Sequence, residues 1–133
     1  MNTTVVLRVS HARLDLDACL TWLPSSRLDR VWRAGERYLR DKVHDTSGFS
    51  VLLAEGLARG SVVQDAVDAF LVLAEPIAEL MRGGAAGEVD FGLLLDESSG
   101  VLSLRLAPAA AAVFERAGVT LVVSAYPTSG DED

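Results

Sequence analysis

The chain has 133 residues, half of them apolar, and its 19 acidic and 12 basic side chains give a net charge of −7 at pH 7. A field of that sign repels nucleic acid and anionic membrane surfaces, so the composition predicts neither as a partner. The chain has one cysteine, so it is predicted to lack an internal disulfide. Its apolar runs are too short for a signal sequence or a membrane span, and both features together predict a cytoplasmic protein.

The first elements predicted along the chain are two strands and a short helix. Alternation of apolar with more polar residues predicts a strand near 3–10, and a β-branched and apolar run predicts another near 49–54. Between them, Asp15 can cap a helix whose apolar residues recur at helical spacing and which Pro24 ends. The basic segment 27–42 shows no period, which predicts an irregular loop.

The longest predicted helix begins at a capping box. Ser61 with Gln64 forms that box, and an apolar stripe at helical spacing then runs as far as Met81. Pro76 lies inside this pattern and removes one backbone hydrogen bond. The sequence therefore predicts a kink near Val72 or a break into two helices.

The last third of the chain is predicted to form a hairpin, a helix and a strand. Two alternating runs predict a β-hairpin over 89–106, with a five-residue loop at 96–100. A proline in the first turn and a glycine beyond the end predict a helix over 108–117. A final strand is predicted at 119–126, followed by an acidic flexible tail at 127–133.

The element order is therefore β-α-β-α-β-β-α-β, which predicts an α+β fold in one domain over residues 1–126. The sheet is expected to be mixed or antiparallel, with the helices packed on one of its faces. Seven apolar residues from different elements are expected to share the core: Leu7, Leu20, Phe70, Leu73, Phe91, Leu104 and Leu121.

The sequence lacks the spacing patterns that typically mark catalytic, cofactor and metal sites. The glycine-rich segment "RGGAAGEVD", residues 82–90, follows a helix and leads into a strand, whereas a phosphate-binding turn follows a strand and opens a helix. His11 and His44 have no histidine or cysteine partner at ligand spacing, which favours two surface histidines over zinc. No turn of the GxSxG type presents a nucleophile. The sequence therefore predicts a protein that is not an enzyme and uses no cofactor or metal.

The basic segment 27–42 admits two interpretations. It holds six of the twelve basic residues and three acids, so its net charge is +3 and the rest of the chain carries −10. In the first interpretation Arg33 and Arg37 bind an anion while Trp32 and Tyr38 stack on the ligand. In the second, a largely buried Trp32 anchors the loop, Gly35 allows a tight turn, and the arginines pair with acids such as Glu36. The interleaved acids favour the second interpretation.

The segments "LPSSRLDRVWRAGER", "GFSVLL" and "VTLVVSAY", in their order with the long helix, resemble the bacterial family called domain of unknown function 4279. Members typically carry a turn similar to "PTxxWxxGE" after the first helix. The matching places here are taken by Pro24, Ser25, Trp32, Gly35 and Glu36, with extra residues inserted between Pro24 and Trp32. The resemblance supplies no catalytic residue. It implies a similarity to immunity proteins, which bind and block a cognate bacterial toxin.

The sequence and this resemblance together predict a cytosolic immunity-type inhibitor whose partner is a basic toxin domain. The expected contacts are acids of the long helix and of the hairpin loop: Asp65, Asp68, Glu75, Glu79, Asp96 and Glu97. Ordinary solvation accounts equally well for any one of these acids. The alternative function is a small-ligand or anion-binding module, or an enzyme, that uses Trp32, Arg33 and Arg37.

Overall fold

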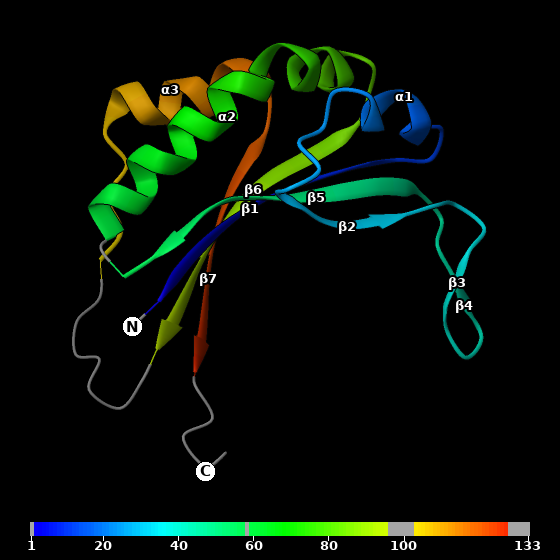
Figure 1. The fold of residues 1–133 in the computed structure, drawn as a ribbon, viewed down its shortest axis with the longest axis horizontal. Coiled ribbons are helices and arrows are strands. Elements are labelled where there is room, and N and C mark those ends of the chain that lie inside the picture. Colours follow the sequence, from blue (N-terminus) through cyan, green and yellow to red (C-terminus); the bar gives the residue numbers. More distant parts are fainter. Residues whose placement is uncertain (1, 58, 96–102, 128–133) are drawn as a thin grey trace.

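In the part of the chain that the structure describes, the fold consists of a five-stranded sheet, a separate two-stranded hairpin and three helices (Figure 1). The computed structural model describes residues 2–57, 59–95 and 103–127. In chain order its elements are β1 (Thr3–His11), α1 (Leu16–Leu20), β2 (Leu28–Trp32), β3 (Arg37–Leu39), β4 (Lys42–Val43), β5 (Ser47–Gly56), α2 (Arg59–Arg82), β6 (Ala86–Leu95), α3 (Pro108–Ala117) and β7 (Thr120–Pro127).

The strand order in the sheet is β2-β5-β1-β6-β7. The central strand β1 is antiparallel to both β5 and β6, and β2 is antiparallel to β5. The edge strand β7 is parallel to β6 and reaches it through α3. The mixed sheet with helices confirms the predicted α+β class. Strands β3 and β4 pair with each other in a separate small hairpin.

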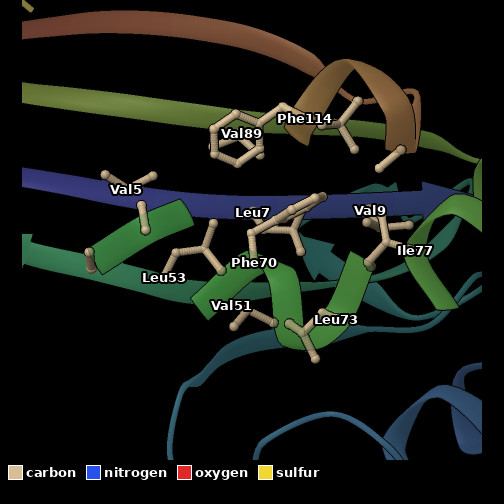
Figure 2. Close-up of a cluster of buried hydrophobic side chains, with 14 of the residues drawn as sticks. Val5, Leu7, Val9, Val51, Leu53, Phe70, Leu73, Ile77, Val89 and Phe114 are labelled. Carbon is tan, nitrogen blue, oxygen red and sulfur yellow. The ribbon is translucent and has the colours of Figure 1, made fainter. Parts of the chain in front are cut away.

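The helices lie on one face of the sheet, as predicted (Figure 1). Helix α2 connects β5 to β6, which lie on opposite sides of β1, so it crosses over the central strand. It packs on β5 and β1, while α3 packs on α2 and β7. Figure 2 shows the core between these layers, built from Val5, Leu7, Val9, Val51, Leu53, Phe70, Leu73, Ile77, Val89 and Phe114. The opposite face of the sheet has no helix among the described residues; it is called the open face below.

The seven residues predicted to form the core differ in how deeply they are buried. Four are buried as expected: Leu7, Phe70, Leu73 and Phe91. Leu104 is partly buried and packs against the core. Leu20 and Leu121 are each 36% exposed, so their predicted burial is wrong. Leu20 ends α1 on its outer side, and Leu121 lies on an edge strand that the helices do not fully cover.

The predicted hairpin over 89–106 does not form. Residues 103–107, which include most of its second arm, have no strand structure, and the predicted loop at 96–100 lies outside the described residues. The first arm exists as β6, but both of its sides already have partners, β1 and β7. A hairpin neighbour would need one of those sides, so the parallel strand β7 takes the place that the sequence pattern gave to residues 102–106.

Helix α2 is one continuous helix, so of the two outcomes predicted for Pro76, a kink or a break, the break does not occur. Pro76 lies inside it and lacks one backbone donor. Leu73 and Ile77, on either side of the proline, are buried in the core. Packing on both sides of Pro76 therefore holds the helix together. Since α2 begins at Arg59, Ser61 lies within the helix and is not its N-cap.

The two shorter helices have the ends that their capping residues predict. The Asp15 carboxylate accepts a hydrogen bond of 3.1 Å from the Ala18 backbone N–H and so caps α1, as predicted. Helix α1 nevertheless ends at Leu20, one turn before Pro24. Helix α3 has Pro108 in its first turn and Gly118 just beyond its last.

Candidate functional site

The basic segment 27–42 is more ordered than its sequence suggests. It contains the edge strand β2, which pairs with β5, and the small β3–β4 hairpin, which projects away from the sheet (Figure 1). The prediction of an irregular loop is therefore wrong. An edge strand needs only one partner and buries little of its surface, so it lacks the alternating pattern that marks the central strands. Arg37 lies in β3 and is exposed.

Gly35 and Glu36 form the turn that connects β2 to the hairpin. Gly35 has a φ of +89°, in the left-handed region that favours glycine. Its N–H donates a hydrogen bond of 2.8 Å to the His44 carbonyl. The Glu36 carboxylate accepts one of 3.0 Å from the Arg33 N–H. The positive φ of Gly35 fits the tight turn of the structural interpretation, whereas Glu36 contacts the backbone N–H of Arg33 rather than its guanidinium.

Arg33 is held by an acid from a distant part of the chain. Its guanidinium forms an ion pair of 2.8 Å with Asp17 in α1, and both side chains are exposed. The hydrogen bond and the charge of Asp17 raise the pKa of Arg33. An exposed pair of this kind contributes little to stability. The ion pair nevertheless holds the guanidinium of Arg33 next to α1. This position does not favour an anion site that Arg33 shares with Arg37.

Trp32 lies on the open face of the sheet. It pairs with Gly48 across the β2–β5 register, and a Cβ at Gly48 would lie 2.6 Å from Cε2 of Trp32. The indole N–H donates to Oγ1 of Thr46 at 3.4 Å. Trp32 is partly buried, which does not contradict the expectation that most of its side chain is covered. The ring covers Gly48, but its outer surface has no helix over it.

Trp32 forms one wall of a hollow on the open face. This hollow has a volume of about 450 Å³. Its polar lining comes from neighbouring strands: Arg8 and Ser10 from β1, Glu88 from β6 and Thr120 from β7. The sequence does not reveal this group, because only the strand register brings Arg8, Glu88 and Thr120 into one row.

A partly buried ion pair lies beside this hollow. Nη1 of Arg8 is 3.1 Å from Oδ2 of Asp90. Asp90 is 7% exposed, and its other oxygen, Oδ1, has no hydrogen-bond partner among the described residues. A buried carboxylate needs a partner to offset its loss of water. The Arg8 guanidinium therefore offsets the free-energy cost of burying the Asp90 carboxylate in the sheet.

Four acids lie on the solvent side of α2. Asp65, Asp68, Glu75 and Glu79 are all exposed and occupy positions i, i+3, i+10 and i+14, which face the same way on a helix. We call these four residues the acidic face. Val72, which is 80% exposed, lies within the row, and Leu71, which is 53% exposed, lies beside it. The structure thus brings together the four predicted helical contacts around an apolar centre.

A groove between α2 and β5 extends the acidic face towards the sheet. It has a volume of about 800 Å³, and its acidic lining comes from Asp65, Asp68 and Glu55. Apolar atoms of both elements form its floor. Arg27 closes one side by donating a hydrogen bond of 2.7 Å to the Leu53 carbonyl. A partner seated on the acidic face can therefore also enter the groove.

Glu75 and Glu79 of the acidic face each border a further hollow. Asp96 and Glu97 lie outside the described residues. Glu75 borders a shallow groove between α2 and α3, where Arg116 is also found. Glu79 borders a third hollow, of about 360 Å³, on the opposite side of α2 from that groove and next to α1.

Metal-ligating side chains do not cluster in the described part of the chain. Cys19 is buried, and burial together with the charge of Asp15 raises the pKa of its thiol. It packs as a small apolar residue, as predicted. Within residues 2–57, 59–95 and 103–127, no three His, Cys, Asp or Glu side chains are grouped so as to hold a metal ion. None of the helices described has the length and apolar character needed to cross a membrane.

Comparisons with family models, with curated proteins and with solved structures find no match to this chain.

Proposed function

We propose that this protein is a non-catalytic binding protein and that its acidic face docks a basic partner protein. The observation that carries the proposal is the row of four exposed acids around Val72 on α2. Interfaces that hold a partner typically combine an apolar centre with a polar rim. An exposed valine between carboxylates is a small version of that arrangement.

The size of the acidic face suits contact with a folded domain. Residues 65 and 79 are fourteen positions apart, so the row is about 21 Å long. The negative field of the row adds to the overall charge of −7. Such a field raises the rate at which a cationic surface associates and suppresses association with anionic ones. The groove beside β5 supplies the depth that a flat helix face lacks.

The particular partner that we propose is a bacterial toxin domain, so that the protein acts as a cytoplasmic immunity protein. Two points support this: the resemblance of segments such as that containing Trp32 and Gly35 to the family described above, and the acidic charge. A toxin that cleaves nucleic acid has a basic active site, because its substrate is anionic. An acidic face can occupy such a site without any chemical step.

Co-expression with the product of the neighbouring gene tests this function. The wild-type protein should relieve the toxicity of that product and form a complex with it. A variant with Asp68→Lys and Glu75→Lys should fold normally and fail to protect. If the neighbouring product is toxic and the wild-type protein neither protects against it nor binds it, the immunity function is wrong.

The hollow beside Trp32 supports a second candidate function, the binding of a small ligand on the open face. Arg8, Glu88 and Trp32 offer a cation, an anion and an aromatic wall within one space of about 450 Å³. Arg33 and Arg37 are not part of its lining. A ligand would therefore use Arg8 in their place. Titration with inorganic phosphate and with benzoate, followed by tryptophan fluorescence, tests it, since a Trp32→Phe variant should lose any response of the wild-type protein.

A further inference from the structure

Strand β7 forms one edge of the sheet and is not protected as edge strands usually are. Its outer side pairs with no other strand in the part of the chain that the structure describes. None of its eight residues is charged, and its sequence is "TLVVSAYP". Leu121 is 36% exposed, Val123 is 56% exposed and Tyr126 is 48% exposed. A neutral edge with exposed apolar side chains is a template for another strand.

The opposite edge, β2, has the protection that β7 lacks. Its pairing with β5 is interrupted by a register shift between Leu28 and Arg30, and the residue at the shift is Asp29. Bulges and charged side chains are the usual devices that prevent an edge from pairing with another chain. By contrast, β7 pairs with β6 without any shift over eight residues, from Thr120 to Pro127. Its backbone is therefore regular enough to accept a further strand.

The exposed side chains of β7 continue the apolar core beyond the helix layer. Leu121 is in register with Val89, and Val123 is in register with Phe91. Val89 and Phe91 are both fully buried beneath the helices. Neighbours in register share a face of the sheet, so Leu121 and Val123 lie on the core face as well. The core face is thus left partly exposed at this edge.

We propose that β7 pairs antiparallel with β7 of a second copy of this chain, so that two sheets join into one of ten strands. Antiparallel pairing about a two-fold axis is self-complementary, and it places the Leu121 and Val123 side chains of both copies next to one another. Each copy covers the apolar edge that the other leaves exposed. The dimer is stabilised by the backbone hydrogen bonds of the new strand pair and by this apolar contact.

The charge distribution favours a second copy over the basic partner at this edge. Strand β7 itself carries no charged residue, although the whole chain carries −7. Two copies can therefore approach through this edge without the repulsion that the rest of the surface would cause. Helix α2 packs on β5 and β1, away from β7, so both acidic faces stay accessible in the dimer.

Sedimentation equilibrium on the full chain tests the proposal. The wild-type protein should reach twice its monomer mass of 14.2 kDa as its concentration is raised to about 100 µM. Val123→Arg should raise the dissociation constant by on the order of thirtyfold or more. Val31→Arg is the matched control, since Val31 is 47% exposed on the other edge strand, and it should leave the constant unchanged. A wild-type protein that stays monomeric, or a Val123→Arg variant that dimerises normally, overturns the proposal.

A cysteine scan keeps the proposal testable if Val123→Arg fails to fold. Single cysteines are placed in turn at positions 121 to 125 in a Cys19→Ala background, and each variant is oxidised. In a two-fold antiparallel pair only one residue faces its own copy, with Cβ atoms about 4.5 to 5.5 Å apart. Cross-linked dimer should therefore peak at one position and fall sharply two residues away. Equal yields at all exposed positions, or none at any, contradict strand pairing.

Discussion

Replacing Gly48 by alanine tests whether Trp32 is held flat against the sheet. A Cβ at this position would lie 2.6 Å from Cε2 of Trp32 and 2.5 Å from the backbone oxygen of Val9. Carbon atoms in contact are normally about 3.5 to 4.0 Å apart, so the ring must move by about 1 Å. The Val9 oxygen belongs to the central strand and cannot move without disturbing β1. We expect Gly48→Ala to destabilise the fold by about 3 kcal/mol, at the upper end of overpacking costs.

A double-mutant cycle in urea separates the two contacts. Trp32→Ala should cost about 2 to 3 kcal/mol, less than the loss of a fully buried aromatic ring, because Trp32 is only partly buried. In the Trp32→Ala background, Gly48→Ala should cost at least about 1 kcal/mol less than in the wild-type protein, since the ring is no longer in the way. If the two costs simply add, or if Gly48→Ala alone costs nothing, Trp32 does not pack on Gly48 as described.

Three further predictions concern charges and the thiol. Arg8→Met should lower the free energy of unfolding by about 2 to 3 kcal/mol, because it leaves the buried carboxylate of Asp90 without a partner. When Asp90→Leu is added, urea melts should show that most of this loss is recovered. Arg37→Ala should change stability by less than about 0.5 kcal/mol, because the side chain is exposed. Burial raises the pKa of Cys19, so the unfolded chain releases this proton at a lower pH than the folded chain does. Stability should therefore fall as pH rises above the ordinary value of 9.0, and Cys19→Ala should remove that part of the fall.

The sequence predicts those parts of the fold that depend on local patterns. The alternation around Leu7 and Phe91 identifies β1 and β6, and the apolar stripe around Phe70 identifies α2. Asp15 and Gly118 mark helix ends because capping is decided by neighbouring backbone groups. In these places local preference and tertiary packing favour the same structure.

The errors arise where the partner of a segment decides its structure. Residues 102–106 alternate like a strand, but β6 has no side left to pair with them, since β7 arrives through α3. Strand β2 has no period of its own and is ordered by β5. The break expected at Pro76 is prevented by packing on both sides of it.

The two candidate surfaces also differ in whether the sequence alone could predict them. The acidic face could be predicted from the sequence, because the spacing of Asp65, Asp68, Glu75 and Glu79 along one helix fixes their common side. The row of Arg8, Glu88 and Thr120 could not, because three strands distant in the sequence contribute one residue each. No local pattern encodes the register that places them together.

The association rate between this protein and the purified product of the neighbouring gene tests the central claim most directly. It is measured at low and at high salt for the wild-type protein and for the variant with Asp68→Lys and Glu75→Lys. The matched control carries Asp41→Lys and Asp45→Lys, an equal change of net charge at exposed positions of the β3–β4 hairpin and its flank. High salt and the α2 variant are each expected to slow association by about tenfold or more, and the control is expected to slow it far less. Association of the α2 variant at the same rate as the wild-type protein would contradict the acidic face as the docking site.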